Sequence, residues 1–265
     1  MKEICRDLAD EQSALKAMLT DLSDEQWQTP TPFYRWTVKD QITHLAWFDR
    51  AASLSIQDPD AFQDQARTLM ASVANFDEAH QTINATGAPL SSDELLAWWS
   101  HESSRLLKAF SSVSPKERLP WYGRDLGARS SATARLMETW AHGQDIVDAF
   151  GLKRPATHRL KHIAHLGAGT LGWSFLVRGF EMPKENIFVR LTSPTGEPWC
   201  WGDETASQSV SGPAEAFCLV VTQRRHVDDT DLDVKGETAR RWMECAQAFA
   251  GTAENGPKPG ERKIP

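Results

Sequence analysis

Apolar residues recur at helical spacing in four long stretches of the first 150 residues. In residues 2–22, isoleucine and leucine return every three or four positions, which is the spacing of one face of an amphipathic helix. Similar spacing occurs in residues 37–56, 91–110 and 130–150. Helices of this kind bury their apolar faces against one another. The pattern therefore predicts a four-helix bundle.

The pattern changes after residue 153. The segment NIFVRLTSPTGEPWCWGDE indicates two strands joined by a Pro/Gly turn, and QSVSG and LDVKGE indicate two further short strands. PAEAFCLVV and ETARRWMEC return to helical spacing. We therefore expect a two-domain α+β protein, with a helical bundle over residues 1–153 and a small α+β domain over 154–252. Residues 253–265 are rich in proline, glycine and charge, which predicts a flexible tail.

Charge limits the partners of this chain. It carries 29 basic side chains against 36 acidic ones, a formal net charge of −7. The acidity lies in the bundle, since residues 1–151 hold 14 lysines and arginines against 22 aspartates and glutamates. Nucleic acids and anionic membranes both attract basic surfaces. We therefore expect neither a nucleic-acid partner nor a membrane partner.

Targeting and redox signals are also absent from the sequence. The amino terminus is charged, and no apolar run approaches the roughly 18 residues of a membrane span. The four cysteines are scattered without a C-x-x-C pair, so a zinc knuckle and a dithiol redox motif are excluded. We expect a cytoplasmic protein with reduced thiols.

One pair of residues in the fourth helical stretch has the spacing of metal ligands. Glu138 and His142 are four residues apart, so they project from the same face of a helix, and in a bundle that face can meet the helix that bears His44. Two histidines and a carboxylate match the three protein ligands of a catalytic zinc site, which leaves a fourth position open. By spacing alone, a solvated ion pair or a core histidine with satisfied hydrogen bonds is the better explanation of the pair.

Two motifs resemble those of a known family. The first is Arg35-Trp36-Thr37-Val38-Lys39-Asp40 followed by His44-Leu45, and the second is Glu138, His142 and Asp145 in an E-x-x-x-H-x-x-D pattern. Together they resemble the DinB-like superfamily of helical bundles, in its mycothiol-dependent maleylpyruvate isomerase branch. Arg35 departs from the motif, since many members have a small residue there.

The second part of the chain extends this resemblance. The segment Val210-Ser211-Gly212-Pro213-Ala214, the apolar helix after it and Arg224-Arg225 are similar to the sterol-carrier-protein-like domain that follows the bundle in that branch. The resemblance therefore implies a DinB-like four-helix bundle followed by a small α+β sterol-carrier-protein-like domain.

The resemblance also implies a divalent metal, with zinc expected, on His44, Glu138 and His142. In the isomerase, the metal activates a low-molecular-weight thiol such as mycothiol for attack on the substrate. A thiolate that adds reversibly to a conjugated double bond permits rotation before it leaves. The same three ligands could instead lower the pKa of a bound water and support hydrolysis.

Four further residues are candidates for the site. Asp145 can accept a hydrogen bond from a ligand imidazole, and His101 can serve as a proton shuttle if it faces the bundle centre. Arg224 and Arg225 can bind the carboxylate of a thiol cofactor or substrate. For each of the four, a surface or packing role is the competing interpretation.

We therefore expect a metal-dependent enzyme that carries out thiol-assisted isomerisation or transfer on a small organic acid, with a homodimer as the candidate assembly. A metal-dependent hydrolase at the same site is the first alternative. The second is a non-catalytic protein that binds a metal and an apolar or acyl ligand. A tRNA-modifying role is disfavoured by the acidic bundle and the lack of a basic stripe.

Overall fold

The computed structural model describes residues 1–262 and divides the chain into two compact units, Met1–Ala149 and Phe150–Pro265. The division falls after Ala149, whereas the sequence pattern places it after residue 153. Within residues 1–262, no helix combines the length and the apolar character that crossing a membrane requires.

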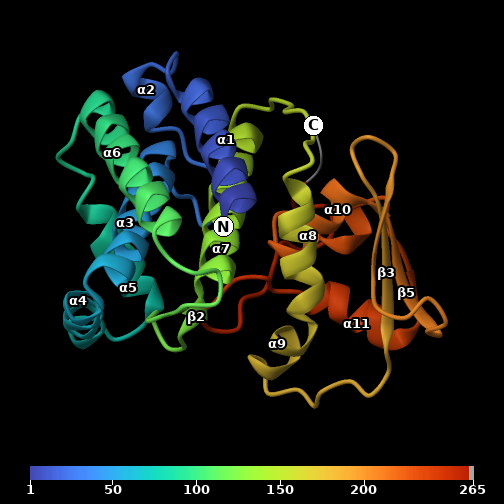
Figure 1. Ribbon diagram of the computed structural model, residues 1–265. Helices are drawn as coiled ribbons and strands as arrows, with labels where there is room; N and C mark the ends of the chain where they lie inside the picture. Colours follow the sequence, from blue (N-terminus) through green and yellow to red (C-terminus); the bar gives the residue numbers. More distant parts are fainter. Residues whose placement is uncertain (263–265) are drawn as a thin grey trace. The chain divides into compact units, whose positions relative to one another are not determined.

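Four long helices run alongside one another in the first unit (Figure 1). They are α1 (Lys2–Leu19), α3 (Val38–Gln57), α6 (Ser92–Ser111) and α7 (Ala128–Ala149). Helix α3 packs against α6 and α7, and α1 packs against α7 and α6. The predicted four-helix bundle is confirmed.

Shorter elements complete the first unit. They are α2 (Asp24–Trp27), α4 (Pro59–Ala71), α5 (Phe76–Ala85) and the two-stranded antiparallel pair β1 (Arg118–Leu119) and β2 (Leu126–Gly127). Helices α4 and α5 both contact α3. The loop between β1 and β2 lies just before α7 in the chain.

Helix α3 begins where the sequence predicts an N-cap. The Asp40 N–H donates to Thr37 Oγ1 at 3.1 Å, and the Thr37 N–H donates to Asp40 Oδ2 at 2.9 Å. This reciprocal capping box satisfies backbone donors that the first helical turn leaves without partners. It fixes the start of α3, and with it the position of His44 two turns further on.

Helix α7 is buried on all sides over much of its length. Every residue from 139 to 147 is buried, and these include polar residues as well as apolar ones. Polar groups in such a helix require hydrogen-bonding or charged partners, because water cannot solvate them. The interior of the bundle therefore contains a polar network as well as an apolar core.

The second unit is the predicted α+β domain. A four-stranded sheet has the order β4-β3-β5-β6, in which β3 and β5 are parallel and the other neighbours antiparallel. The strands are β3 (Ile187–Thr192), β4 (Pro198–Trp201), β5 (Gln208–Pro213) and β6 (Asp233–Lys235). The helices are α8 (Leu160–Gly169), α9 (Leu171–Leu176), α10 (Ala214–Val221) and α11 (Glu237–Cys245), with a short 3-10 turn, Val227–Asp229.

Residues 253–262 are joined to the second unit by hydrogen bonds. Gln223 Nε2 donates to the Glu254 carbonyl at 2.8 Å, and the Gly260 N–H donates to Asp229 Oδ2 at 2.8 Å. The Glu254 N–H donates to Gln247 Oε1 at 3.0 Å. These bonds hold the described part of the predicted tail against α10 and the residues that follow it.

Candidate metal centre

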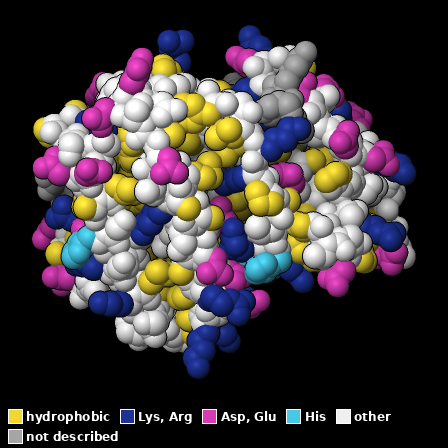
Figure 2. Space-filling view, turned by 90° about the horizontal axis from the view of Figure 1, so that it is seen from above, with side chains coloured by type: hydrophobic (Ala, Val, Ile, Leu, Met, Phe, Trp, Pro, Cys, Tyr) yellow, Lys and Arg dark blue, Asp and Glu magenta, His cyan; other side chains and the backbone are white. Residues whose placement is uncertain are grey.

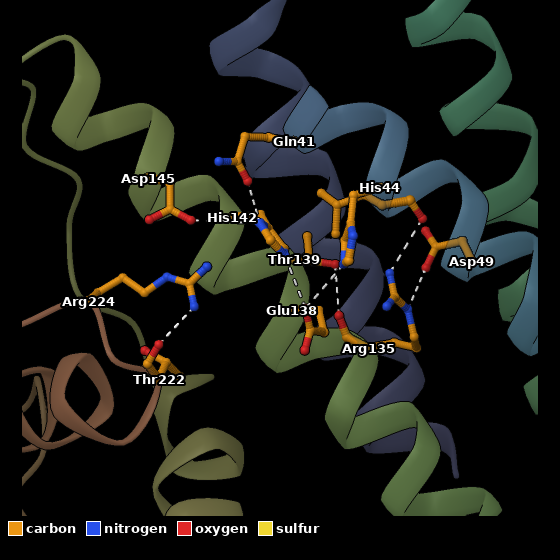
Figure 3. Close-up of polar contacts among 11 residues, drawn as sticks. Gln41, His44, Asp49, Arg135, Glu138, Thr139, His142, Asp145, Thr222 and Arg224 are labelled. Carbon is orange, nitrogen blue, oxygen red and sulfur yellow. Dashed lines mark hydrogen bonds and ion pairs between the residues drawn. The ribbon is translucent and has the colours of Figure 1, made fainter. Parts of the chain in front are cut away.

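The structure brings the three predicted donors together inside the first unit (Figure 3). His44 projects from α3, while Glu138 and His142 project from consecutive turns of α7. Glu138 Oε2 lies 3.1 Å from His142 Nε2 and 3.6 Å from His44 Nε2. One ligand atom from each residue lies within 4.8 Å of the other two, so a single ion can contact all three.

Gln41 determines which nitrogen of His142 carries the ring proton. Gln41 Nε2 donates to Thr31 Oγ1 at 2.8 Å, which turns the amide oxygen toward the imidazole. Gln41 Oε1 is hydrogen-bonded to His142 Nδ1, so Nδ1 is the protonated nitrogen. With Nδ1 protonated, the neutral form of His142 has its lone pair on Nε2, the nitrogen nearest Glu138 and the one that a metal would use.

Charge states in the cluster follow from burial and from mutual contact. Burial lowers the pKa of His44 to about 3, with a further lowering from the charge of His142, so the His44 imidazole is neutral at neutral pH. Burial raises the pKa of Glu138, but hydrogen bonds and charge interactions with His142 and His44 outweigh it and hold the pKa well below its usual range. A neutral His44 imidazole, the His142 imidazole and one carboxylate therefore meet.

This donor set fits a divalent metal. The Glu138 carboxylate oxygen lies 3.1 Å from His142 Nε2, so one cation can contact both atoms. Nitrogen and oxygen donors in this number are typical of catalytic zinc, which keeps a fourth position open. The side chains of His44 and His142 are 9% and 3% exposed, whereas that of Glu138 is 23% exposed, so the cluster can be approached on the Glu138 side.

Aromatic rings lie against both histidines. The Trp36 indole is parallel to the His142 imidazole with ring centroids 6.0 Å apart, and it is tilted against His44 at 5.3 Å. Phe33 contacts His142 edge-on at 5.5 Å, and Phe48 contacts His44 at 4.6 Å. His80, on α5, contacts His44 edge-on at 5.6 Å. Sequence reasoning missed Gln41, Phe33, Phe48 and His80, although Trp36 belongs to the family-like motif.

Trp36 and Phe33 are positioned by a strained turn. The Trp36 N–H donates to the Phe33 carbonyl at 2.9 Å, and the two residues between them, Tyr34 and Arg35, have φ of 48° and 57°. Positive φ at both central residues defines a type I′ turn, which favours asparagine and glycine there. Tyrosine and arginine adopt this backbone conformation at a cost. The turn therefore stores strain next to the histidines.

Replacing Arg35 with glycine should relieve part of that strain. We expect Arg35→Gly to raise the free energy of unfolding by about 1 kcal/mol, because glycine adopts a left-handed backbone without a steric penalty. Arg35→Ala is the matched control, since it removes the same side chain but keeps the Cβ that causes the strain. Urea unfolding of the three proteins measures the effect. Equal stability of the glycine and alanine variants would contradict it.

A buried ion pair underlies the cluster. Arg135 Nε donates to Asp49 Oδ1 at 2.9 Å, and both side chains are almost wholly buried. Gln12 Nε2 and Trp99 Nε1 donate to the other oxygen of Asp49, at 3.3 Å and 3.1 Å. Because Arg135 is one turn before Glu138 and Asp49 is on the same helix as His44, the pair links the two helices that bear the donors.

Two other predicted site residues on the helices have different surroundings. Asp145 is fully buried, with Oδ2 3.7 Å from His142 Nδ1, but that nitrogen donates a hydrogen bond to Gln41 Oε1. His101 is exposed on α6 rather than turned into the bundle, so its position does not favour a proton shuttle.

Arg224 and Arg225 are both buried in the second unit. They follow α10 directly after Gln223, whose φ of 61° turns the backbone so that the Arg224 N–H donates to the Leu219 carbonyl at 2.7 Å. Arg224 Nη1 donates to the Thr222 carbonyl at 2.8 Å (Figure 3). Their burial means that replacing them also perturbs packing, in addition to any ligand contact.

The fold is that of a two-domain protein with a helical bundle. Two helices of the bundle carry two histidines and one glutamate that are placed to bind one metal ion. The family model described as the mycothiol maleylpyruvate isomerase N-terminal domain matches residues 8–147. The chain therefore belongs to this family. A second model, described as wyosine base formation, matches residues 183–234.

Similar proteins cover nearly the whole chain. Uncharacterized proteins from two strains of Mycobacterium tuberculosis are each 42% identical over 250 residues, which is 94% of this chain and 96% of theirs. Two crystal structures of the mycothiol-dependent maleylpyruvate isomerase, one of them a histidine-to-alanine variant, share the fold. The variant has a TM-score of 0.59 at 17% identity, and the other structure has 0.56 at 19%. Each comparison covers 84% of this chain and 89% of the isomerase chain.

Proposed function

We propose that this protein is a metal-dependent enzyme that uses a low-molecular-weight thiol to isomerise, or transfer a group on, a small organic acid. The observation that carries the proposal is the convergence of His44 Nε2, Glu138 Oε2 and His142 Nε2 on one point. Membership of the mycothiol maleylpyruvate isomerase family supports the thiol, with mycothiol as the first candidate.

His44, Glu138 and His142 would hold a divalent metal, zinc by its preference for such donors, and that metal would lower the pKa of a thiol bound there. The chain's own residues prepare the site for this. Gln41 keeps the His142 proton on Nδ1, and burial keeps His44 neutral. The rings of Phe33, Trp36 and Phe48 limit the access of water to the imidazoles.

A thiolate beside these residues can promote isomerisation. When it adds to a double bond conjugated with a carbonyl group, the electron pair moves to the carbonyl oxygen as an enolate and leaves a carbon–carbon single bond that rotates. Collapse of the enolate restores the double bond and expels the thiolate unchanged. Arg224 and Arg225 are the proposed binding residues for a carboxylate of the thiol or the substrate, because a guanidinium binds a carboxylate through two parallel hydrogen bonds.

Nucleic acid is not proposed as a partner. The match to the wyosine base formation model covers residues 183–234, which include none of the three donors. On the face of the molecule shown in Figure 2, basic and acidic side chains are mixed. In the first unit, acidic side chains outnumber basic ones, as described above.

The test is whether a thiol binds the metal and is needed for turnover. In cobalt-substituted protein, mycothiol should produce an intense sulfur-to-metal charge-transfer band, and His142→Ala should abolish it. With maleylpyruvate as the trial substrate, turnover should require the thiol and return it unconsumed.

A hydrolase at the same site predicts the opposite result. Full-rate turnover in thiol-free buffer, with oxygen from labelled water in the product, would reject the thiol-assisted reaction and favour hydrolysis. A cobalt-loaded protein whose spectrum does not change with mycothiol would also contradict the proposal.

A further inference from the structure

We infer that the substrate carries a planar, apolar conjugated group that packs on a wall of aromatic rings beside the three donors. The wall consists of Phe33, Trp36, Phe48, Trp121 and Tyr122. This inference rests on the proposed function, because it names the class of acid that the site would take.

The inner part of the wall touches the donors directly. Phe33 and Trp36 contact His142, and Trp36 and Phe48 contact His44, with ring centroids between 4.6 and 6.0 Å apart. A substrate whose reactive carbons reach His44 and His142 would therefore lie beside these rings. Such rings bind flat apolar groups well, by offset stacking or by edge-to-face packing.

The outer part of the wall comes from a different segment. Trp121 and Tyr122 lie in the loop between β1 and β2, and their rings contact Phe48 at 6.1 and 5.7 Å. Trp121 also stacks on Phe62 at 5.7 Å, with the ring planes 7° apart. Phe62 is fully buried in α4 and anchors the loop rings. The wall therefore continues outward from His44 through Phe48.

The wall rings are not a closed core. All five are partly exposed, in contrast to Phe62 beneath them. Partly exposed rings grouped beside polar donors are characteristic of ligand sites, where apolar walls bind the body of a ligand and a few polar groups orient it. Loops supply Phe33, Trp36, Trp121 and Tyr122, whereas Phe48 and the three donors lie on helices. Binding residues on loops carried by a rigid scaffold are common.

The five rings offer an apolar surface, since none of these side chains is charged at neutral pH. Arg135 on α7 is buried and engaged by Asp49. A small diacid placed against the rings would lose solvation of its carboxylates without gaining a cation from the wall, whereas an aryl-substituted acid would bury apolar surface there.

The inference is tested by comparing two acids as ligands of the zinc-loaded protein. Calorimetric titration with trans-cinnamate, which bears a phenyl group on a conjugated acid, should give a dissociation constant about tenfold below that of maleate, a small diacid. Phe48→Leu and Trp121→Leu should each weaken cinnamate binding about five- to tenfold and leave maleate binding unchanged. Trp98→Leu, at a half-buried tryptophan of α6 outside the wall, is the matched control.

Zinc content and melting temperature of each variant identify a folding defect. Trp121 lies on a loop, where a substitution disturbs folding less than on a packed helix. Trp121→Leu therefore still tests the inference if Phe48→Leu fails to fold. Equal or tighter binding of maleate, no binding of cinnamate, or equal weakening of both acids by the ring variants would overturn the inference. Loss of thiol dependence would instead contradict the proposed function, and the ring-dependent preference would still be measurable.

Discussion

Replacing His44 or His142 with alanine is expected to abolish stoichiometric metal binding, and Glu138→Gln is expected to weaken it. The parent protein should hold about one divalent metal per chain. Each alanine removes one of only three protein donors, so the apparent affinity should fall by more than about a hundredfold, since loss of a residue that only orients a ligand already costs 10- to 100-fold. Glutamine keeps an oxygen donor but loses the charge, so its effect should be smaller.

Elemental analysis after dialysis and competition with a chelating dye measure both the stoichiometry and the affinity. His101→Ala is the matched control, because this histidine is exposed on α6 and should not affect the metal. If each of the three variants retains one metal per chain under the conditions that load the parent, the assignment of the donors is wrong.

Local patterns in the sequence were sufficient to predict the helices that carry this site and two of its three donors. The reciprocal pair of Thr37 and Asp40 lies within one helical turn, so sequence alone predicts the start of α3. Glu138 and His142 share a helix face for the same reason. Bundle packing made His44 a candidate third donor, and the family resemblance then favoured it, because spacing along the chain does not tell how α3 is rotated against α7.

The supporting residues could not be predicted in the same way. Gln41 and His142 are 101 positions apart, and Asp49 and Arg135 are 86 apart. Such contacts depend on helix rotation and on turns that no periodicity describes. The rings of Trp121 and Tyr122 lie on a short loop, and their role depends on a tertiary contact with Phe48. The left-handed turn at Tyr34 and Arg35 also departs from what its residue types favour.

Arg135→Met is expected to destabilise the metal-free protein by about 3–5 kcal/mol, because it leaves the Asp49 carboxylate buried without its cation. Gln12 and Trp99 still donate to Asp49, but neither carries a charge. In the double variant Asp49→Asn/Arg135→Met, the buried charge is gone and an amide oxygen still accepts from Trp99. We expect this double variant to be more stable than Arg135→Met alone.

Urea unfolding in EDTA, followed by circular dichroism, measures these differences. Because the pair joins the helices that carry His44 and Glu138, we also expect Arg135→Met to bind metal more weakly than the double variant does. Equal stability of the single and double variants would show that the cost comes from lost packing rather than from the unpaired charge.

The pH dependence separates these two causes further. Burial raises the pKa of Asp49, and Arg135 opposes that rise, so its removal should raise the pKa of Asp49 again. A carboxyl whose pKa is higher in the folded state binds more protons there than in the unfolded state, so stability falls as the pH rises. The penalty of Arg135→Met should therefore be largest at neutral pH and shrink as the pH is lowered and Asp49 takes up its proton. The double variant has no carboxyl at this position and should lack this dependence. A loss of stability in Arg135→Met that stays constant over this pH range would mean that Asp49 is not an uncompensated charge in that variant.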